Sequence, residues 1–435
     1  MDKSKKSTPP IDRLSSLPDD VICKILSFLP TVDSITTSVL ARRWRNLWAH
    51  VPVLYFLEIY LVDDALNQVL SAHKNPTIDT FLIHLADTCN YDYSDFEKLM
   101  DTVVARKVRN LDVLLYTKLP QIIFSCKTLV ELTLASCDIP DSGDVSLPAL
   151  RKLTLEIVSY ESYKALPNLL SGCPVLEELE IETGYDENHS TYCDVASLTL
   201  KRLSISGNIT ENTSMEYYDL YDALLCESML DTPALRFLRL YRVSPPKVSA
   251  RSLVSLTEAK VDFNFGIQMR PSSRSVLEFV GKLCGVRSLT LSTGFMNITD
   301  SEFSILNVKF PNLTKLVLRE AHEGFVSVFL EKADNLEVLA ITLLYRLEVE
   351  DLNYWVEPKH VPTCLISHLK YVAMYGFKGV EPELDMAKYL LRNSKVLKSF
   401  KIKPLSQQLR LKGKFEELKK VLLERGSDAS RINSH

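Results

Sequence analysis

One short phrase returns through most of this chain: an apolar residue, two variable residues, an apolar residue, one variable residue and an apolar residue. Its last three positions alternate between apolar and variable, which predicts a short strand with one buried face. Turn residues and helix-like stretches, such as LPNLLSGCP and VFLEKADN, separate the copies. Twelve copies recur, on average about 26 residues apart, and IDTFLI at 78 is a possible thirteenth: VRNLDV at 108, LVELTL at 129, LRKLTL at 150, LEELEI at 176, LKRLSI at 200, LRFLRL at 235, LTEAKV at 256, VRSLTL at 286, LTKLVL at 313, LEVLAI at 336, LKYVAM at 369 and LKSFKI at 397.

A strand with a helical or irregular return, repeated every 20–29 residues, is typical of leucine-rich repeats. The region from about 78 to 345 resembles that family, which implies an α/β solenoid with parallel strands on a concave face and helices and loops outside. The match is irregular, because the steps vary, the asparagine expected after the motif is mostly absent, and Ala259 stands where a leucine belongs. We therefore expect an irregular solenoid with insertions near 182–194, 206–222 and 264–275. An ordinary α/β domain with parallel strands is the alternative.

The front of the chain predicts three short helices. Pro18 suits a first helical position, Pro30 ends that helix, and the apolar residues between them fall three and four apart on one stripe. Thr31 and Asp33 are candidate N-caps of a second helix. Three short helices cannot enclose a core that hides every apolar face. The unit therefore either leans on the repeats or keeps an apolar patch for a partner, and the spacing alone does not decide between them.

The stretch IDRLSSLPDDVICKILSFLPTVDSITTSVLARRWRNLW, residues 11–48, resembles an F-box of the plant type. The matching positions are Leu17-Pro18, Ile25-Leu26, Leu29-Pro30, Val39-Leu40, Arg42, Trp44, Leu47 and Trp48. This resemblance implies docking onto a Skp-family adaptor and, through it, onto a cullin–RING ubiquitin ligase. It also implies that Trp44, Leu47 and Trp48 are divided between the unit's own packing and its junction with the first repeat. The implied adaptor-binding residues are Leu17, Pro18, Ile22, Ile25, Leu26, Leu29, Val39 and Leu40.

The end of the chain resembles the FBD domain that follows repeats in many plant F-box proteins. Trp355, Pro358, Val361-Pro362, Cys364-Leu365 and the loop at Gly379 carry the match, together with YLLRNSKVLKSFKI. We interpret this region as the C-terminal closure of the solenoid.

Beyond it, KGKFEELKKVLLERG predicts an amphipathic helix with Phe415, Leu418 and Leu422 on one side, a Glu416–Lys420 ion pair and a stop at Gly426.

These expectations divide the chain into five parts: a disordered tail at 1–10, an F-box at 11–50, a leucine-rich-repeat solenoid at 51–345, an FBD-type cap at 346–425 and a disordered tail at 426–435.

Composition argues against several other classes of protein. The formal net charge of −4 gives no overall attraction to nucleic acid or to an anionic membrane. No phosphate-binding glycine loop and no nucleophile elbow occurs in the sequence. The nine cysteines are scattered and never form C-x-x-C, which favours buried free thiols. The start MDKSKKSTPP is not a secretory signal, so we expect an intracellular, reducing location in the nucleus, the cytoplasm or both.

No residue pattern predicts catalysis. HSTYC at 189–193 places a histidine and a cysteine four apart, but in a polar loop without other ligands nearby, so we expect no metal and no cofactor. An F-box protein would instead contribute proximity, holding a substrate near a ubiquitin-loaded enzyme whose own subunits supply the chemistry. A hydrolase or redox enzyme hidden in the repeats is the alternative from another class.

Solvent-facing strand positions of a repeat solenoid form its usual binding face, so we expect a protein substrate there. The third, fifth and seventh phrase positions supply the candidates, and each of them could also be an ordinary solvated strand residue. Phe237, Arg239 and Tyr241 are the best group, because interface hot spots favour aromatics and arginine. A receptor with a small-molecule ligand in the repeat bowl and a non-degradative scaffold are the rival functions. The other candidates are Glu178, Glu180, Glu182, Lys315, Arg319, Tyr371 and Tyr375.

Overall fold

The computed structural model of the protein describes residues 14, 16–59, 64–86, 92–141, 143–183, 193–207, 228–249, 251–263, 272–294, 296, 298–299, 301–320, 323–343, 355–405, 412–424 and 432–433. It forms two compact units, Met1–Leu176 and Glu177–His435. Within the described ranges, no helix combines the length and the apolar character that a membrane crossing requires.

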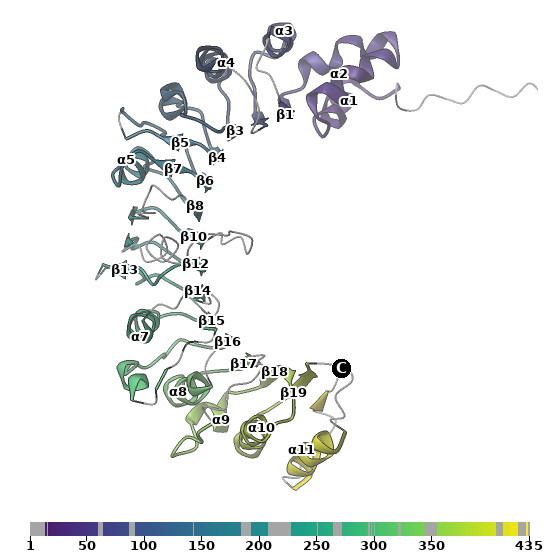
Figure 1. The fold of residues 1–435 in the computed structure, drawn as a ribbon. Coiled ribbons are helices and arrows are strands. Elements are labelled where there is room, and N and C mark those ends of the chain that lie inside the picture. Colours follow the sequence, from purple (N-terminus) through teal and green to yellow (C-terminus); the bar gives the residue numbers. More distant parts are fainter. Residues whose placement is uncertain are drawn as a thin grey trace, which may run out of the picture. The chain divides into compact units, whose positions relative to one another are not determined.

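The first unit opens with four short helices and continues as a parallel sheet in the order β1-β2-β3-β4-β6 (Figure 1). The two short strands β5 and β7 pair beside it. Its elements are α1 (Asp19–Leu26), α2 (Thr31–Thr36), η1 (Thr37–Val39), η2 (Arg42–His50), β1 (Val53–Ile59), α3 (Asp64–Ala72), β2 (Thr80–Leu85), α4 (Tyr93–Ala105), β3 (Asn110–Leu114), η3 (Gln121–Ser125), β4 (Glu131–Ala135), β5 (Asp138–Ile139), β6 (Lys152–Glu156), β7 (Ser159–Tyr160) and α5 (Ala165–Ser171).

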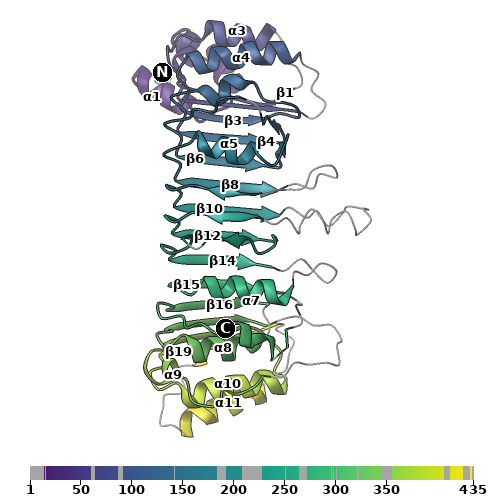
Figure 2. The ribbon, with the colours of Figure 1, turned by 90° about the vertical axis from the view of Figure 1, so that its left-hand side faces the viewer.

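The second unit is a longer parallel sheet in the order β8-β10-β12-β14-β15-β16-β17-β18-β19-β20 (Figure 2). Helices α7, α8 and α10 lie on one side of this sheet and leave its other face open (Figure 1). Its elements are β8 (Glu178–Thr183), β9 (Val195–Ala196), β10 (Arg202–Gly207), β11 (Met229–Asp231), β12 (Phe237–Tyr241), β13 (Lys247–Val248), β14 (Glu258–Asp262), α7 (Ser273–Lys282), β15 (Ser288–Ser292), η4 (Glu302–Ile305), β16 (Lys315–Arg319), α8 (Gly324–Lys332), β17 (Val338–Thr342), α9 (Thr363–Ser367), β18 (Tyr371–Phe377), α10 (Glu381–Asn393), β19 (Ser399–Pro404), α11 (Lys412–Glu424) and β20 (Ile432–Asn433).

The structure confirms the predicted α/β architecture of repeated parallel strands. All twelve phrases, and IDTFLI at 78, coincide with strands that begin at the third phrase position. The apolar positions are buried, and the variable positions between them face the open side of the sheet. Ala259, the one small residue at a leucine position, is fully buried in β14.

A backbone connection recurs at the start of most strands that carry the repeated phrase. The carbonyl oxygen of Lys370 accepts hydrogen bonds from the N–H groups of Lys398 and Ser399, at 2.7 and 3.1 Å. The carbonyl at the second position of one phrase thus accepts the N–H groups of the second and third positions of the next phrase. Because backbone atoms make this connection, the side chains at these positions are free to vary. The same double acceptance occurs at Asp79, Arg109 and Val130 in the first unit and at Glu177, Lys201, Arg236, Thr257, Arg287, Thr314 and Glu337 in the second.

Phenylalanines fill the space between the sheet and the helices of the second unit. Phe303 and Phe325 meet edge to face with ring centroids 5.1 Å apart, and Phe310 and Phe329 lie 4.9 Å apart. Such pairs add to the free energy gained by burying the rings. The first pair joins η4 to α8, and the second joins α8 to the segment that leads into β16.

The cysteines that the structure describes are free thiols, and most of them are buried, as the sequence predicts. Burial raises the pKa of Cys173 to about 12 and is the largest cause of the same shift at Cys137 and Cys364. These thiols therefore stay protonated at neutral pH and are poor nucleophiles.

At the end of the chain, α11 packs on α10. The ammonium group of Lys388 lies 2.7 Å from Glu417 and within 4 Å of Glu381 and Asp385, and its side chain is only 14% exposed. Leu418 of α11 is fully buried, as predicted from its position on the apolar side. This contact supports the interpretation of the region as a closure of the second unit.

Several details differ from the sequence-based expectations. Glu416 pairs with Lys419, three residues on, at 3.0 Å, and not with Lys420. Residues three apart and residues four apart both share a helix face, so the charge pattern alone fits either pair. Thr31 is the first residue of α2 rather than its N-cap, and its hydroxyl accepts the N–H of Tyr55 at 2.7 Å. Two residues of the expected C-terminal tail form β20, because backbone groups at the edge of β19 pair with them.

Other expectations fall partly or wholly outside the described residues: the N-terminal tail, most of the three insertions, HSTYC, the side chains of Phe415 and Leu422, and Gly426.

The repeat core makes a direct prediction about stability. We expect Leu289→Ala, at a fully buried position of β15, to lower the free energy of unfolding by about 2–5 kcal/mol through lost burial and a cavity. The neighbouring Thr290→Ala, on the open face, should change it by less than about 0.5 kcal/mol. Urea unfolding followed by circular dichroism measures both, and equal losses would contradict the assignment of the two faces.

Candidate functional site

The helices α1, α2, η1 and η2, here called the front helices, share a small apolar core. Ile22 and Leu26 of α1 pack against Trp44 and Leu47 of η2 and against Val51. An ion pair between Asp19 and Arg43, with Oδ1 and Nη2 2.6 Å apart, joins the same two helices at the surface. Trp44 and Leu47 therefore belong to the unit's own packing.

The front helices are also tied to the first repeats. The buried imidazole of His73, which follows α3, donates from Nε2 to the carbonyl oxygen of Val51 at 2.7 Å. Its Nδ1 lies 3.1 Å from the guanidinium of Arg106 and can only accept there, so the ring is neutral. Burial lowers the pKa of His73, which agrees with this assignment. The backbone N–H of Lys74 donates to the carbonyl oxygen of Ala49 at 2.7 Å.

Despite these attachments, the front helices keep a broad apolar surface. Six of the eight predicted adaptor-binding residues are at least partly accessible: Leu17 is half-buried, whereas Pro18, Ile25, Leu29, Val39 and Leu40 are exposed. The exposed fraction reaches 86% at Val39 and 65% at Leu40. The structure places the other two, Ile22 and Leu26, inside the core, at 0% and 1% exposure, because their side of α1 faces η2. Both predicted alternatives are therefore true at once: the front helices contact the first repeats, and they also expose an apolar patch.

Three members of this patch are absent from the predicted adaptor-binding residues: Val21, Phe28 and Val32. Phe28 is 73% exposed and Val32 is 59% exposed. Phe28 lies three residues after Ile25 and seven after Val21, so its helical spacing could have placed it on the same stripe. We call the accessible apolar side chains of these helices the front patch: Leu17, Pro18, Val21, Ile25, Phe28, Leu29, Val32, Val39 and Leu40.

The only described cysteine among the front helices is structural. The Cys23 thiol donates to the carbonyl oxygen of Leu47 at 3.5 Å. Burial raises its pKa, and the carboxylates of Asp19 and Asp20 add to the effect. It borders a hollow of about 680 Å³ between α1 and η2, lined mainly by polar side chains, but a protonated thiol gives that hollow no nucleophile.

In the second unit, all the predicted substrate-binding residues lie on the open face of the sheet. The strand register arranges this face in three rows, called here the first, middle and last rows, which run across the strands. Glu178, Phe237, Lys315 and Tyr371 belong to the first row. Glu180 and Arg239 lie in the middle row. Glu182, Tyr241, Arg319 and Tyr375 belong to the last row.

The structure brings three of these residues to one hollow. Tyr241, Arg319 and Tyr375 line a depression of about 780 Å³ at the end of the strands. Val317 and Ala340 of the middle row also line it, as do Arg242 and Glu320. We call this depression the last-row hollow. Its remaining lining residues are Asp262, Ser292 and Thr342.

The best-ranked sequence group, Phe237 to Tyr241, sits in a cluster of cations. The guanidinium of Arg202 lies 4.3 Å from the Phe237 ring centroid, and the ammonium of Lys260 lies 5.3 Å from it. The guanidinium of Arg242 stands 5.3 Å from the centroid of Tyr241. Sequence reasoning missed Arg202 and Lys260, although they occupy the third and fifth positions of their phrases, so the phrase pattern could have found them.

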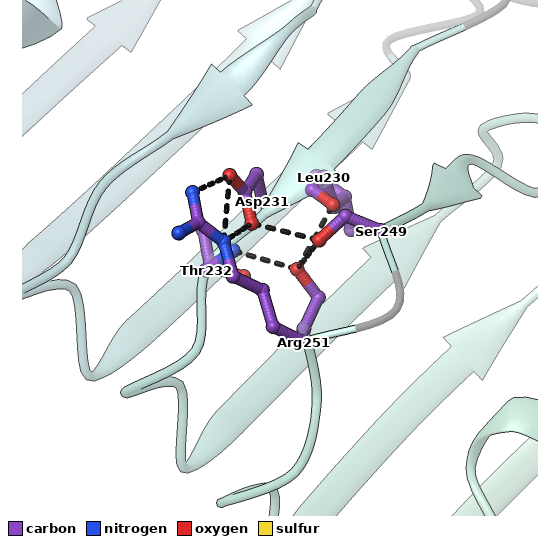
Figure 3. A network of polar contacts seen from close by, with 6 residues as sticks. Leu230, Asp231, Thr232, Ser249 and Arg251 are labelled. Atoms are coloured by element: carbon purple, nitrogen blue, oxygen red, sulfur yellow. Dashed lines mark hydrogen bonds and ion pairs between the residues drawn. The ribbon is translucent and has the colours of Figure 1, made fainter.

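In the short sheet β9-β11-β13, a polar network joins β11 to the segment that follows β13 (Figure 3). The Asp231 carboxylate accepts hydrogen bonds from Arg251 and, at 2.7 Å, from the Ser249 hydroxyl. The Ser252 hydroxyl donates to the carbonyl oxygen of Leu230 and accepts the N–H of Thr232 at 2.8 Å. Each group faces its partner in the network, so we assign it to structure rather than to a binding site.

Metal chemistry finds no support among the described residues, where no group of three or more histidine, cysteine, aspartate or glutamate side chains could hold an ion.

Comparison with known proteins identifies related sequences in three parts of the chain. Family models match the chain in three places: the F-box domain at residues 14–56, the LRR repeats of FBD-associated F-box protein At5g56370 at 96–250, and FBD at 357–402. The F-box/FBD/LRR-repeat protein At3g52680 of Arabidopsis thaliana is 31% identical over 94% of this chain and 89% of its own length. From the same organism, the FBD-associated F-box protein At5g38590 is 30% identical over 89% of this chain and 92% of its own length.

The Asp231 network predicts a pH dependence. The hydrogen bonds from Arg251, followed by those from Ser249, lower the pKa of Asp231 to about 2 from 3.8. Because the folded pKa is below the unfolded one, this carboxylate stabilises the fold above about pH 4, and the stabilisation is lost as the pH falls towards 2. The Tm deficit of Asp231→Asn against wild type should therefore shrink between pH 5 and pH 2.

Asp101→Asn, at an exposed position of α4, controls for the loss of one surface carboxylate. A deficit of Asp231→Asn that stays constant with pH would contradict the role of this carboxylate.

Proposed function

The chain belongs to the F-box/FBD/LRR-repeat proteins, and we propose that it is the substrate-recognition subunit of a Skp–cullin–F-box ubiquitin ligase. The front helices would dock a Skp-family adaptor, and the repeats would bind a protein substrate. The observation that carries the proposal is the front patch: a small helical unit that buries one side of its helices and exposes large apolar side chains on the other.

The exposed members of the front patch support adaptor docking. Val39 and Leu40 stand at the end of η1, at 86% and 65% exposure, where no described element of this chain covers them. Ile25 lies in the last turn of α1, and Phe28, which comes two residues after the end of this helix, is 73% exposed. An apolar patch of this kind on a small helical unit marks a protein interface. In this account Leu17, Pro18, Ile25, Leu29, Val39 and Leu40 face the adaptor, together with Val21, Phe28 and Val32.

Ile22 and Leu26 have a different part in the proposal. Because both are buried against η2, they would hold α1 at the angle that presents the patch, without touching the adaptor themselves. Their replacement would weaken docking by unfolding the front helices, whereas replacement of an exposed residue would weaken it directly.

The part of the proposal that concerns substrate binding is based on the open face of the second unit. Glu178, Glu180, Phe237, Arg239, Tyr241, Lys315, Arg319, Tyr371 and Tyr375 all point away from the buried side of their strands. Aromatic and arginine side chains are enriched at binding hot spots. We propose that this face binds the substrate and that partner subunits supply the catalysis of ubiquitin transfer, so that the chain acts by proximity and not as an enzyme.

The proposal also sets boundaries and a location. We propose an F-box at 11–50, repeats at 51–345 and an FBD-type cap at 346–425, with the nucleus or the cytoplasm as the site of action. The family models at 14–56, 96–250 and 357–402 lie inside or close to these limits.

Adaptor docking is tested by changing the patch without changing the core. We expect Val39→Asp/Leu40→Asp to weaken binding of a purified Skp-family adaptor by at least about a hundredfold, because two charges would be buried at an apolar interface. Isothermal titration calorimetry measures the affinity, and the Tm of the variant should stay within a few degrees of wild type, since both side chains are exposed.

The matched control is Leu198→Asp/Val254→Asp, which introduces the same charges at exposed apolar positions of the second unit. This control should bind the adaptor like wild type. Failure of the wild-type chain to bind, or an equal loss in both double variants, would overturn the proposal.

A further inference from the structure

Charge is unevenly distributed on the open face of the second unit. Strands β15 to β19 place fifteen side chains in its three rows, of which four are lysine or arginine and none is aspartate or glutamate. On β8 to β14, by contrast, acids outnumber cations. The four cations are Lys315, Arg319, Lys401 and Lys403.

These four cations are exposed and available. Each is accessible in its strand, and none forms an ion pair with a carboxylate that the structure describes. This distinguishes them from Arg202 and Lys260, which lie within 4 Å of Glu178 and Glu258. A partner could therefore neutralise them without first breaking an internal ion pair.

In the middle row, the side chains between the two cationic strands β16 and β19 are short. In the middle row, Ala340 and Ala373 lie between Val317 of β16 and Lys401 of β19. In the last row, Thr342 and Tyr375 lie between Arg319 and Lys403. The short alanine side chains leave space beside the Tyr375 ring, and the last-row hollow extends from there towards β12.

The register fixes the spacing between the two cationic edges. Strands β16 and β19 are three steps apart in the sheet, which corresponds to about 14 Å at about 4.8 Å per step. An extended segment lying across the strands covers this distance in about four residues, at about 3.3 Å per residue. Because alternate side chains of an extended segment point the same way, residues i, i+2 and i+4 would face the sheet together.

We propose that this surface recognises an extended acidic segment of the substrate, with two carboxylates four residues apart and an apolar residue midway between them. One carboxylate would meet Arg319, with Lys315 adding positive charge from the other end of β16, and the other would meet Lys401 and Lys403. The apolar residue would lie on Ala340 and Ala373, against the ring of Tyr375. This inference rests on the proposed function, because it names the class of substrate that the repeats would select.

The carboxylates near this surface set the position of the segment. Asp262, Glu320 and Arg242 also line the last-row hollow. Asp262 ends β14, whereas Glu320 directly follows Arg319 at the end of β16. These two carboxylates outnumber Arg242, and the other acids of β8 to β14 lie further along the sheet. An acidic segment is therefore favoured over β16 to β19 and disfavoured nearer to β8, where Glu178 and Glu180 would repel it.

The test uses the full chain and fluorescein-labelled nonapeptides followed by fluorescence anisotropy. The probe has glutamates at its third and seventh positions, valine at its fifth and glycine or serine elsewhere. One control peptide has its two glutamates adjacent, and a second has lysines in their place. We expect the probe to bind at least tenfold more tightly than either control and to weaken as salt rises from 50 to 300 mM.

Charge reversal identifies the surface. Arg319→Glu/Lys401→Glu should weaken probe binding at least tenfold, whereas Lys359→Glu/Lys395→Glu, at exposed positions outside the three rows, should leave it within twofold. If the reversal variant loses cooperative melting, Arg319→Gln/Lys401→Gln keeps the test valid, with at least a threefold loss expected. Equal binding of all three peptides, or equal losses in the two reversal variants, would overturn the inference.

Adaptor binding is measured on the same samples. Adaptor binding without probe binding would overturn only the acidic substrate class, and probe binding without adaptor binding would overturn the proposed ligase function while leaving the acidic surface in place.

Discussion

The repeats of this protein depend on one backbone connection, the carbonyl that accepts two N–H groups where most of the phrase strands begin. It occurs in both units and is made by backbone groups, and at the carbonyls of Arg236 and Arg287 a threonine hydroxyl donates as well. Buried leucines fix the inner face, and the double acceptance fixes where the next strand starts. The residues between are therefore constrained only by solvent, and Lys315, Arg319, Lys401 and Lys403 can gather on one open face at little cost to the fold.

The front helices, by contrast, are held together by a small core of side chains. Their core is so small that Ile22, Leu26, Trp44, Leu47 and Val51 are nearly all of it. A unit of this size buries only one side of its helices. The contacts of Val51 with His73 and of Thr31 with Tyr55 attach it to the first repeats and leave the front patch exposed. In the proposed function, the front patch binds the adaptor, and the side chains in the three rows of the sheet determine which substrate is bound.

Much of the fold follows from the sequence, because the buried positions repeat at a fixed spacing. Each phrase became a strand, and even Ala259 kept its buried place. Strand β1 carries no such phrase, and β9, β11 and β13 are two or three residues long, too short to show a periodic pattern. Their pairing depends on contacts such as Ser249 to Asp231, between residues far apart in the sequence.

The candidate site was predictable in part for the same reason. Helical spacing put Ile22, Leu26 and Leu29 on one stripe, but only the position of η2 decides which of them is buried. Phrase positions could have identified Lys401 and Lys403, yet their significance depends on the alanines of the neighbouring strands, which only the register reveals.

Hydrogen–deuterium exchange of the full chain, with and without a purified Skp-family adaptor, tests the central claim most directly. The account predicts that the adaptor slows amide exchange in peptides covering residues 17–40 and leaves β10 to β19 unchanged. Protection of the strands instead of the front helices, or no protection at saturating adaptor, would contradict it.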